Sequence, residues 1–361
     1  GFKVLCGREA VNEKFIRGAI PKEVEQGLKF AKVRGVSDEL LARMDGVTGA
    51  IGIFETGRPG PVIAFRCELD CIPVKETDDP EHIPNKEGFA SEHEGYMHAC
   101  SHDGPQAVLM GLAKWIKANA DKLCGTVKII YQPAEEGGRG ARPMAESGLL
   151  DDVDFLYCGH FGCDIPGGEV ITAPEKFLCS TKIDVHYKGL PSHAFMHPEA
   201  GRNALMAAAT ASLALMSLPR HGLGATGVNV GVLRAGEGRN VVASTAEMLC
   251  DVRGENSIIT KELVRQAIER FTHAAEMYEC SVDYKFLGET LDLKPDPEAR
   301  DNIARAAEGV TYVDKISSWM NFNGSEDATV LADRVQKLGG KCSYVVVGSE
   351  LKACHHQSKL D

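Results

Sequence analysis

Two short runs of polar residues constrain this chain more than any other feature of its sequence. The first, His98-Ala-Cys-Ser-His-Asp103, places a thiol and an imidazole two positions apart. The second, Tyr131-Gln-Pro-Ala-Glu-Glu136, ends in two adjacent carboxylates that follow the apolar run 127–131. Thiolate, imidazole and carboxylate groups together can hold one or two ions such as Zn²⁺ or Mn²⁺. A carboxylate that binds no metal can then deprotonate a metal-activated water, so the two runs indicate hydrolytic chemistry.

The composition excludes several classes of protein. The 361 residues are 43% hydrophobic, which is enough for a large core and favours two domains over one. The sequence contains no apolar run of about 18 residues that would predict a membrane span. The formal net charge of −11 argues against nucleic-acid binding, which normally needs a basic patch. The twelve cysteines are scattered and form no CxxC motif, so we interpret them as mostly buried thiols of a cytoplasmic protein.

The hydrophobic pattern predicts alternating strands and helices in the first half of the chain. Residues 20–45 have helical periodicity, 49–54 and 62–66 are typical of strands, and 75–95 are typical of a polar loop. A helix is expected from Gln106 to Ala118. The strand 127–131 then delivers Glu135 and Glu136 to a loop at its carboxyl end, where open α/β sheets place their sites.

The pattern changes at about Phe177. The elements expected next are a strand at 182–187, a helix at 203–217, strands at 227–232 and 246–252, a helix at 261–278 and a strand at 280–286. This β-α-β-β-α-β order is the sequence pattern of a ferredoxin-like unit. The predicted fold class is therefore α/β with two domains. A metal-binding catalytic domain with a central mixed sheet comprises 1–175 and 289–361, and an inserted ferredoxin-like α+β domain comprises 176–288.

Further motifs follow one another along nearly the whole chain. They are Arg66-Cys-Glu-Leu-Asp70-Cys-Ile-Pro73, Gly159-His160, Gly189-Leu-Pro-Ser-His193, Gly238-Arg-Asn240, Asp251-Val-Arg253, Gly324-Ser-Glu-Asp327 and His355-His356. With the first two runs, they resemble the M20 metallopeptidase/amidohydrolase family, and most of all its aminoacylase-like branch. That branch includes aminobenzoyl-glutamate utilisation proteins and auxin-conjugate and hippurate hydrolases. The resemblance implies that the inserted domain is a lid and dimerisation domain, and that the protein is a homodimer.

The resemblance also implies two divalent metal ions per chain, with Mn or Zn expected and Co as a further option. The residues that match the family's metal ligands are Cys100, His102, Glu136, His160 and His356, with His355 as the alternative to His356. Glu135 matches the general base. Asp70 matches a carboxylate that orients a ligand imidazole, which is the usual support of a metal site.

Three residues of the inserted domain match positions that bind substrate in the family. Arg253 and Asn240 match groups that hold a substrate carboxylate, a role that suits the fork of an arginine. His193 matches a residue beside the polarised carbonyl oxygen. His193 and Asn240 can serve either their own site or that of a partner subunit. The simpler alternatives are a surface salt bridge for Arg253 and a turn residue for Asn240.

The implied activity is hydrolysis of the amide bond of N-acyl or N-aroyl amino acids, such as aminobenzoyl-glutamate-like substrates. A metal-activated water would attack, with Glu135 as the general base. One alternative is a metallo-carboxypeptidase or dipeptidase that acts on small peptides. A second is a catalytically silent homologue that binds metal or ligand, and a third is a thiol amidase with Cys100 as nucleophile. The expected partner is a small molecule, with no nucleic acid and no membrane.

The chain departs from the family pattern at three positions. Ser101 stands where the family usually has glycine, Pro105 where it has a second histidine, and Ser358 where it has proline. None of these changes removes an expected ligand. Family members also have a helix before the first expected strand and another after the last motif. We therefore expect the sequence to represent part of a longer protein.

Overall fold

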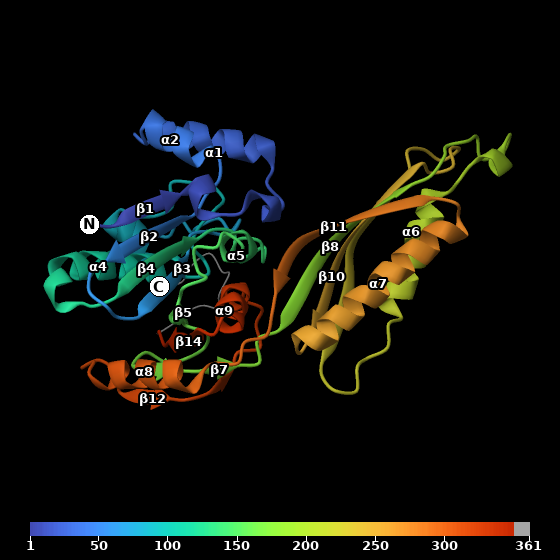
Figure 1. Cartoon of the computed structure of the whole chain (residues 1–361). Coiled ribbons are helices and arrows are strands. Elements are labelled where there is room, and N and C mark those ends of the chain that lie inside the picture. Colours follow the sequence, from blue (N-terminus) through green and yellow to red (C-terminus); the bar gives the residue numbers. More distant parts are fainter. Residues whose placement is uncertain (350–361) are drawn as a thin grey trace. The chain divides into compact units, whose positions relative to one another are not determined.

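The computed structural model describes residues 1–349 and divides the chain into two compact units. Unit 1 comprises Gly1–Lys176 and the chain from Leu293 onward, and unit 2 comprises Phe177–Asp292 (Figure 1). Within the described residues, no helix is both long enough and apolar enough to cross a membrane.

Unit 1 is built on an eight-stranded mixed sheet with the order β1-β2-β4-β3-β5-β14-β6-β12. Its strands are β1 (Lys3–Cys6), β2 (Ala50–Glu55), β3 (Val62–Glu68), β4 (Thr126–Gln132), β5 (Phe155–Phe161), β6 (Glu169–Ile171), β12 (Lys315–Ser317) and β14 (Lys341–Val347). The four central strands β4, β3, β5 and β14 are parallel to one another. β2 and β6 flank them and run antiparallel to β4 and β14. This sheet confirms the prediction of an α/β fold with a central mixed sheet.

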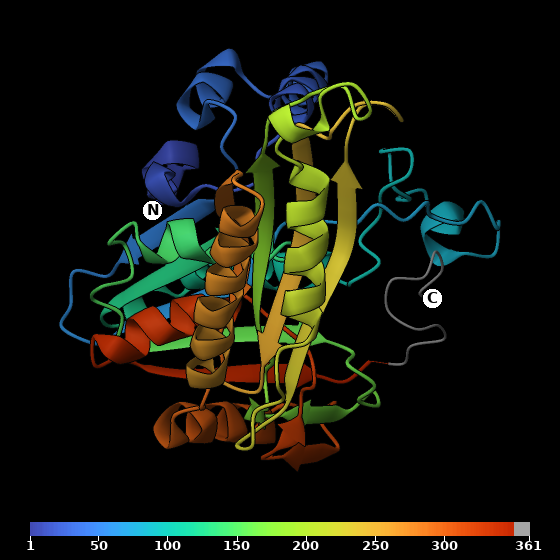
Figure 2. The same cartoon turned by 90° about the vertical axis from the view of Figure 1, so that its right-hand side faces the viewer.

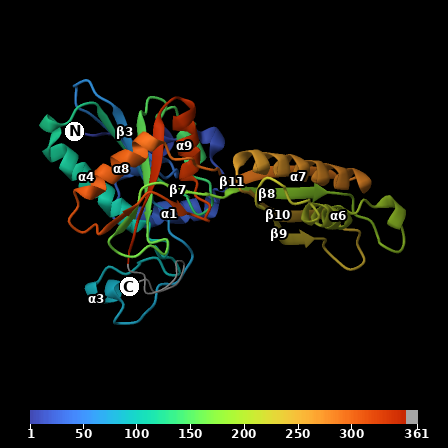
Figure 3. The same ribbon diagram turned by 90° about the horizontal axis from the view of Figure 1, so that it is seen from below.

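Helices cover both faces of this sheet. They are α1 (Pro21–Val33), α2 (Asp38–Met44), α3 (Ile83–Glu87), α4 (Asp103–Ala118), α5 (Ala141–Ala145), α8 (Pro297–Glu308) and α9 (Ala328–Lys337). α4 and α8 lie on one face, and α9 lies on the other (Figure 3). Because both faces are covered, the central strands are apolar along most of their length, as in β4. α3 interrupts the segment 75–95, which the sequence predicted as a polar loop. A separate parallel pair joins β7 (Pro174–Glu175) to β13 (Met320–Asn321).

Unit 2 contains six elements in the order strand, helix, strand, strand, helix, strand. They are β8 (Cys179–Lys188), α6 (Ala204–Met216), β9 (Thr226–Ala235), β10 (Thr245–Gly254), α7 (Ser257–Met277) and β11 (Ser281–Thr290). The strands form an antiparallel sheet with the order β11-β8-β10-β9. Both helices cover the same face of the sheet (Figure 2). This is the arrangement of a ferredoxin-like unit.

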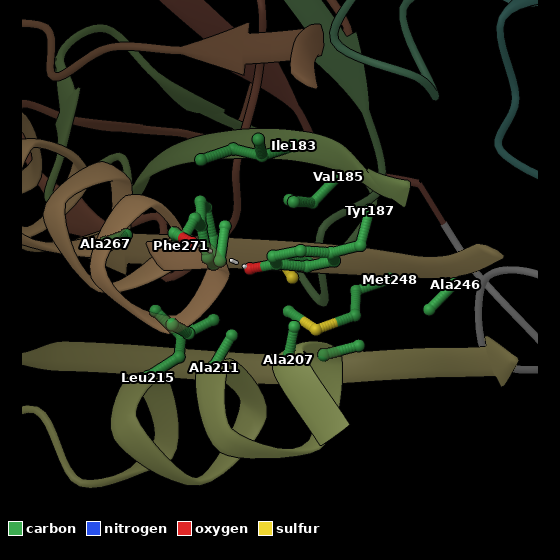
Figure 4. Close-up of a cluster of buried hydrophobic side chains, with 14 of the residues drawn as sticks. Ile183, Val185, Tyr187, Ala207, Ala211, Leu215, Ala246, Met248, Ala267 and Phe271 are labelled. Carbon is green, nitrogen blue, oxygen red and sulfur yellow. Dashed lines mark hydrogen bonds between the residues drawn. The ribbon is translucent and has the colours of Figure 1, made fainter. Parts of the chain in front are cut away.

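The core of unit 2 lies between the sheet and its two helices. Ile183, Val185 and Tyr187 alternate along β8 and are all buried beneath the helices (Figure 4). Small side chains such as Ala207 on α6 let that helix approach the sheet closely. The hydroxyl of Tyr187 donates a hydrogen bond of 3.2 Å to the carbonyl oxygen of Phe271, so its polar end is satisfied inside the core.

Candidate functional site

The candidate site lies at the carboxyl edge of the central parallel strands of unit 1. Asp70 follows β3, Glu135 and Glu136 follow β4, and His160 lies near the end of β5. Because parallel strands end at the same edge of a sheet, these side chains converge although they are distant in sequence. Cys100 and His102 immediately precede α4, whose N-cap is His102. The structure therefore brings together every expected residue of unit 1 that it describes.

The two imidazoles present the same nitrogen to the site. The Nδ1 atom of His102 lies 2.9 Å from the carbonyl oxygen of Asp70, and that of His160 lies 2.7 Å from the carbonyl oxygen of Phe161. A carbonyl oxygen only accepts, so each Nδ1 must carry the proton. Each Nε2 then carries a lone pair, which is the form that binds metal. Burial lowers the pKa of His102 to about 4, so this ring stays neutral near pH 7.

The potential ligand atoms form three overlapping groups. In each group, one atom from each residue lies within 4.8 Å of the others: Cys100, His102 and His160; His102, Glu135 and Glu136; Glu135, Glu326 and Asp327. The first group offers sulfur and nitrogen and the third only oxygen, so the site suits Zn²⁺-like ions at one end and Mn²⁺-like ions at the other. Within residues 1–349, the buried Nε2 atom of His102 has no hydrogen-bond partner. A bound cation would satisfy that lone pair, so the residues fit a metal.

Electrostatics around Cys100 and Glu135 favour the same interpretation. Burial raises the pKa of the Cys100 thiol, and the carboxylates of Glu136 and Glu135 raise it further. Burial also raises the pKa of Glu135 well above its usual range, with added repulsion from Glu326. Without a metal, both groups therefore hold protons that a cation would displace.

Asp70 supports two of the expected ligands through different atoms. Its backbone carbonyl accepts the hydrogen bond from His102, whereas the nearest carboxylate oxygen lies 3.7 Å from the same Nδ1. The other carboxylate oxygen accepts a hydrogen bond of 3.1 Å from the backbone N–H of Glu136. The resemblance implied that a carboxylate orients the imidazole, but here the backbone of Asp70 makes the shorter contact.

A buried ionic network beside the site was not assigned from the sequence. The guanidinium of Arg66 contacts Glu68 and lies 3.0 Å from Glu326 and 3.2 Å from Asp327. The Tyr344 hydroxyl donates a hydrogen bond of 2.6 Å to Glu326. One guanidinium thus faces three carboxylates, with Glu135 close by, and the surplus of negative charge favours bound cations. The available signal was that Arg66 and Glu326 stand in motifs that received no role.

In unit 2, the expected substrate-binding residues lie in two separate places. The backbone N–H of Ala194 donates a hydrogen bond of 3.0 Å to the carbonyl oxygen of Asn240, so the His193 and Asn240 segments are adjacent. His193 Nδ1 accepts hydrogen bonds from the backbone N–H groups of two following residues, which leaves the proton on Nε2. Arg253 lies near the far end of β10 and forms an ion pair of 2.8 Å with Asp251.

Asn240 precedes β10 and Arg253 lies near its end, so the two residues stand at opposite ends of this strand. β10 has ten residues. At about 3.3 Å per residue, it separates Asn240 from Arg253 by roughly 30 Å or more. The structure therefore does not bring His193 and Asn240 together with Arg253 within one subunit. His355 and His356 lie outside the described residues.

Comparisons with known proteins agree with these motifs. Residues 64–361 match the model of the family described as peptidase family M20/M25/M40. The chain is 43% identical over 360 residues to a p-aminobenzoyl-glutamate hydrolase homolog of Haemophilus influenzae, covering all of this chain and 85% of that protein. It is 41% identical over 368 residues to the indole-3-acetyl-aspartic acid hydrolase of Enterobacter agglomerans, covering all of this chain and 84% of that protein.

A solved structure is also similar over nearly the whole chain. It is the aminobenzoyl-glutamate utilization protein from Klebsiella pneumoniae, with a TM-score of 0.84 and 34% sequence identity. The match covers 97% of this chain and 82% of that one.

Proposed function

The chain belongs to the M20/M25/M40 peptidase family of hydrolases, and from this membership we propose that it hydrolyses the amide bond of N-acyl or N-aroyl amino acids. The relatives named for p-aminobenzoyl-glutamate and indole-3-acetyl-aspartate support this substrate class, because each name joins an aromatic acyl group to an acidic amino acid. The observation that carries the proposal is the convergence of a thiol, two imidazoles and the Glu135–Glu136 pair at one sheet edge.

We propose that two divalent ions bind at this edge. Their ligands would be Cys100, His102, Glu136, His160 and one of the C-terminal histidines, His356 or His355. Mn and Zn are the favoured metals, with Co as a further option; the thiol favours Zn. When bound, such ions acidify water and polarise a substrate carbonyl.

Glu135 is the proposed general base. Its Oε2 atom lies 3.9 Å from His102 Nε2, so it borders the metal ligands without needing to be one of them. It would accept a proton from the attacking water and later donate it to the leaving amine. Its buried surroundings raise its pKa, and that raised pKa helps a carboxylate to carry a proton between two steps.

The carboxylate of the amino-acid half is proposed to bind Arg253. Asp251 already holds one side of this guanidinium, which leaves the other N–H groups for a second carboxylate. His193, with its proton on Nε2, can donate to an oxygen that gains negative charge. The length of β10 separates these two functions, so a small substrate cannot contact both in one subunit. We therefore propose that His193 and Asn240 serve the site of a partner subunit.

Unit 2 is accordingly proposed to be the lid and dimerisation domain. Its strand β9 is an edge strand, with one neighbour in the sheet. The outer face of α6 is apolar: Leu213 is 75% exposed and Met216 is 54% exposed. An open strand edge beside an apolar helix face suits a second copy of the same unit. The free thiols of the eleven described cysteines favour a cytoplasmic location.

The decisive experiment measures amino-acid release from a panel of N-acyl amino acids that includes p-aminobenzoyl-glutamate and indole-3-acetyl-aspartate. It uses chelated protein before and after the addition of Mn²⁺ or Zn²⁺. Metal-restored release supports the proposal, whereas release that survives chelation would support a thiol amidase based on Cys100. Dipeptides in the same panel test the carboxypeptidase or dipeptidase alternative. Silence on every substrate, with metal bound, would indicate a binding protein.

A further inference from the structure

The segment Pro133–Arg139, here called the Glu135 loop, closes on itself at its neck. The carbonyl oxygen of Ala134 accepts hydrogen bonds from the backbone N–H groups of Arg139 and Gly140, at 3.1 and 3.3 Å. A Cβ atom on Gly140 would lie 1.5 Å from the carbonyl oxygen of Pro133, so the two ends of the loop touch. Glu135 and Glu136 project from this closed loop, and their positions depend on how its neck is held.

The carboxylate of Asp327 bonds to both ends of that neck. Its Oδ1 atom accepts a hydrogen bond of 2.6 Å from the side-chain amide of Gln132, the residue before the loop. Its Oδ2 atom accepts hydrogen bonds from the backbone N–H groups of Gly140 and Ala141, the residues after the loop, at 3.2 and 3.0 Å. Asp327 comes from the start of α9, far along the chain, so it ties the loop to a separate element.

Asp327 makes these contacts at the expense of its usual local role. It is the N-cap residue of α9, but its side chain makes no capping hydrogen bond. Glu326 accepts the hydrogen bond from the backbone N–H of Ala328 instead, at 2.9 Å. Asp327 is fully buried, and its four partners, with Arg66 as the fourth, are all donors. Only an acceptor at both oxygens satisfies them, so a carboxylate is required here and an amide is not equivalent.

We propose that Asp327 is a positioning residue that fixes the Glu135 loop, and with it both carboxylates of the reaction site. This inference rests on the proposed function of Glu135 and Glu136. Asp327 itself would touch neither substrate nor metal. Its effect follows from geometry, because a small displacement of a reacting group costs a large factor in rate. A loosened loop would also weaken metal binding through Glu136.

The test compares Asp327→Asn with Asp333→Asn, a matched change on a surface-paired residue of the same helix. Hydrogen exchange of the metal-free proteins is measured on the peptide that spans 133–141, followed by Mn²⁺ or Zn²⁺ titration and steady-state kinetics. In the Asp327 variant we expect exchange of this peptide to be about tenfold faster. We expect metal affinity about 10- to 100-fold weaker, and kcat lowered by a similar factor with KM nearly unchanged. The Asp333 variant should match the unmodified protein in all three.

Unchanged exchange and unchanged metal affinity in a folded Asp327→Asn variant would overturn the proposal. If that variant does not fold, Gln132→Met removes the contact at the entry side of the neck, and the exchange and metal measurements are made on it. No change in either would overturn the proposal equally. Exchange and metal binding need no substrate, so a failure of the proposed activity would leave these two results readable.

Discussion

The carboxylate of Asp70 accepts a hydrogen bond of 3.1 Å from the backbone N–H of Glu136. The backbone carbonyl of the same residue holds the imidazole of His102 at 2.9 Å. One residue therefore fixes two proposed metal ligands, one through its side chain and one through its main chain. Only the first of these contacts can be removed by mutation.

Replacement of Asp70 by alanine should weaken metal binding about 10- to 100-fold, because the Glu136 segment loses its anchor. Asp70→Asn should have a much smaller effect, since its side-chain oxygen can still accept the hydrogen bond from the Glu136 N–H. Both should leave the tautomer of His102 unchanged, because the backbone carbonyl remains. Metal titration monitored by calorimetry separates the two variants. Equal losses in both would show that the charge of Asp70 matters rather than its hydrogen bond.

Replacement of Glu135 by glutamine should separate metal binding from chemistry. The amide has nearly the same shape but cannot take a proton from water, so turnover should fall about 10²- to 10⁴-fold. Metal content, measured by elemental analysis, should stay at the level of the unmodified protein. Glu136→Gln is the informative comparison, because it should lose metal as well as activity. Near-normal turnover in Glu135→Gln would exclude Glu135 as the base.

The local elements of the site were predictable from sequence because their signals are local. The expected strand 127–131 is β4 (Thr126–Gln132), and the helix expected from Gln106 begins slightly earlier, at Asp103. The earlier start is permitted because Pro105 falls in the first helical turn, where its missing N–H costs nothing. The helix expected from Lys261 likewise begins at Ser257, since the side chain of Asn256 caps it.

The ionic network beside the site was not predictable in the same way. Arg66 and Asp327 are separated by 261 positions, and no periodic pattern relates residues that far apart. The sequence marked both as parts of motifs, but their pairing depends on how β3 and α9 meet in three dimensions. The protonated nitrogen of each imidazole was also hidden, because a backbone carbonyl determines it. Such contacts belong to the tertiary structure and leave no local trace.

Metal binding should release a proton from Cys100. Burial and the adjacent carboxylates raise the pKa of this thiol, so it is protonated at pH 7 in the metal-free protein. A thiolate is the form that binds metal, so the proton must leave when the ion enters. Calorimetric titrations in buffers of different ionisation enthalpy count the protons released. Cys100→Ser should release about one proton fewer per chain. An unchanged count would mean that Cys100 is not a ligand.

Ser101 occupies a backbone conformation that favours glycine. Its φ is 61°, in the left-handed region, between the proposed ligands Cys100 and His102. Ser101→Gly should relieve about 1–2 kcal/mol of steric cost. It should also add about 0.5–1 kcal/mol of unfolded-state entropy, which leaves a net gain of about 0–1 kcal/mol. Urea denaturation measures the change. Ser217→Gly, at a φ of −88°, has no strain to relieve and should not stabilise the protein. A clear loss of stability in Ser101→Gly would contradict this account.

Two inactive variants should restore activity when they share a dimer. Asn240 lies beside His193, and Arg253 lies at the opposite end of β10, so one substrate cannot reach both within a subunit. If His193 serves the partner's site, a Glu135→Gln subunit can supply its intact His193 to a His193→Ala subunit that keeps its base. An equal mixture then forms one working site in each mixed dimer, or about a quarter of the unmodified activity.

The measurement uses the two variants refolded together, with each refolded alone as the control. Neither variant alone should exceed its own low activity, and the mixture should recover only when subunits can exchange. A mixture no more active than the average of the two variants would place His193 in its own subunit's site. That outcome would require β10 and the segments at its ends to rearrange, because the length of the strand forbids a shared small substrate in the present fold.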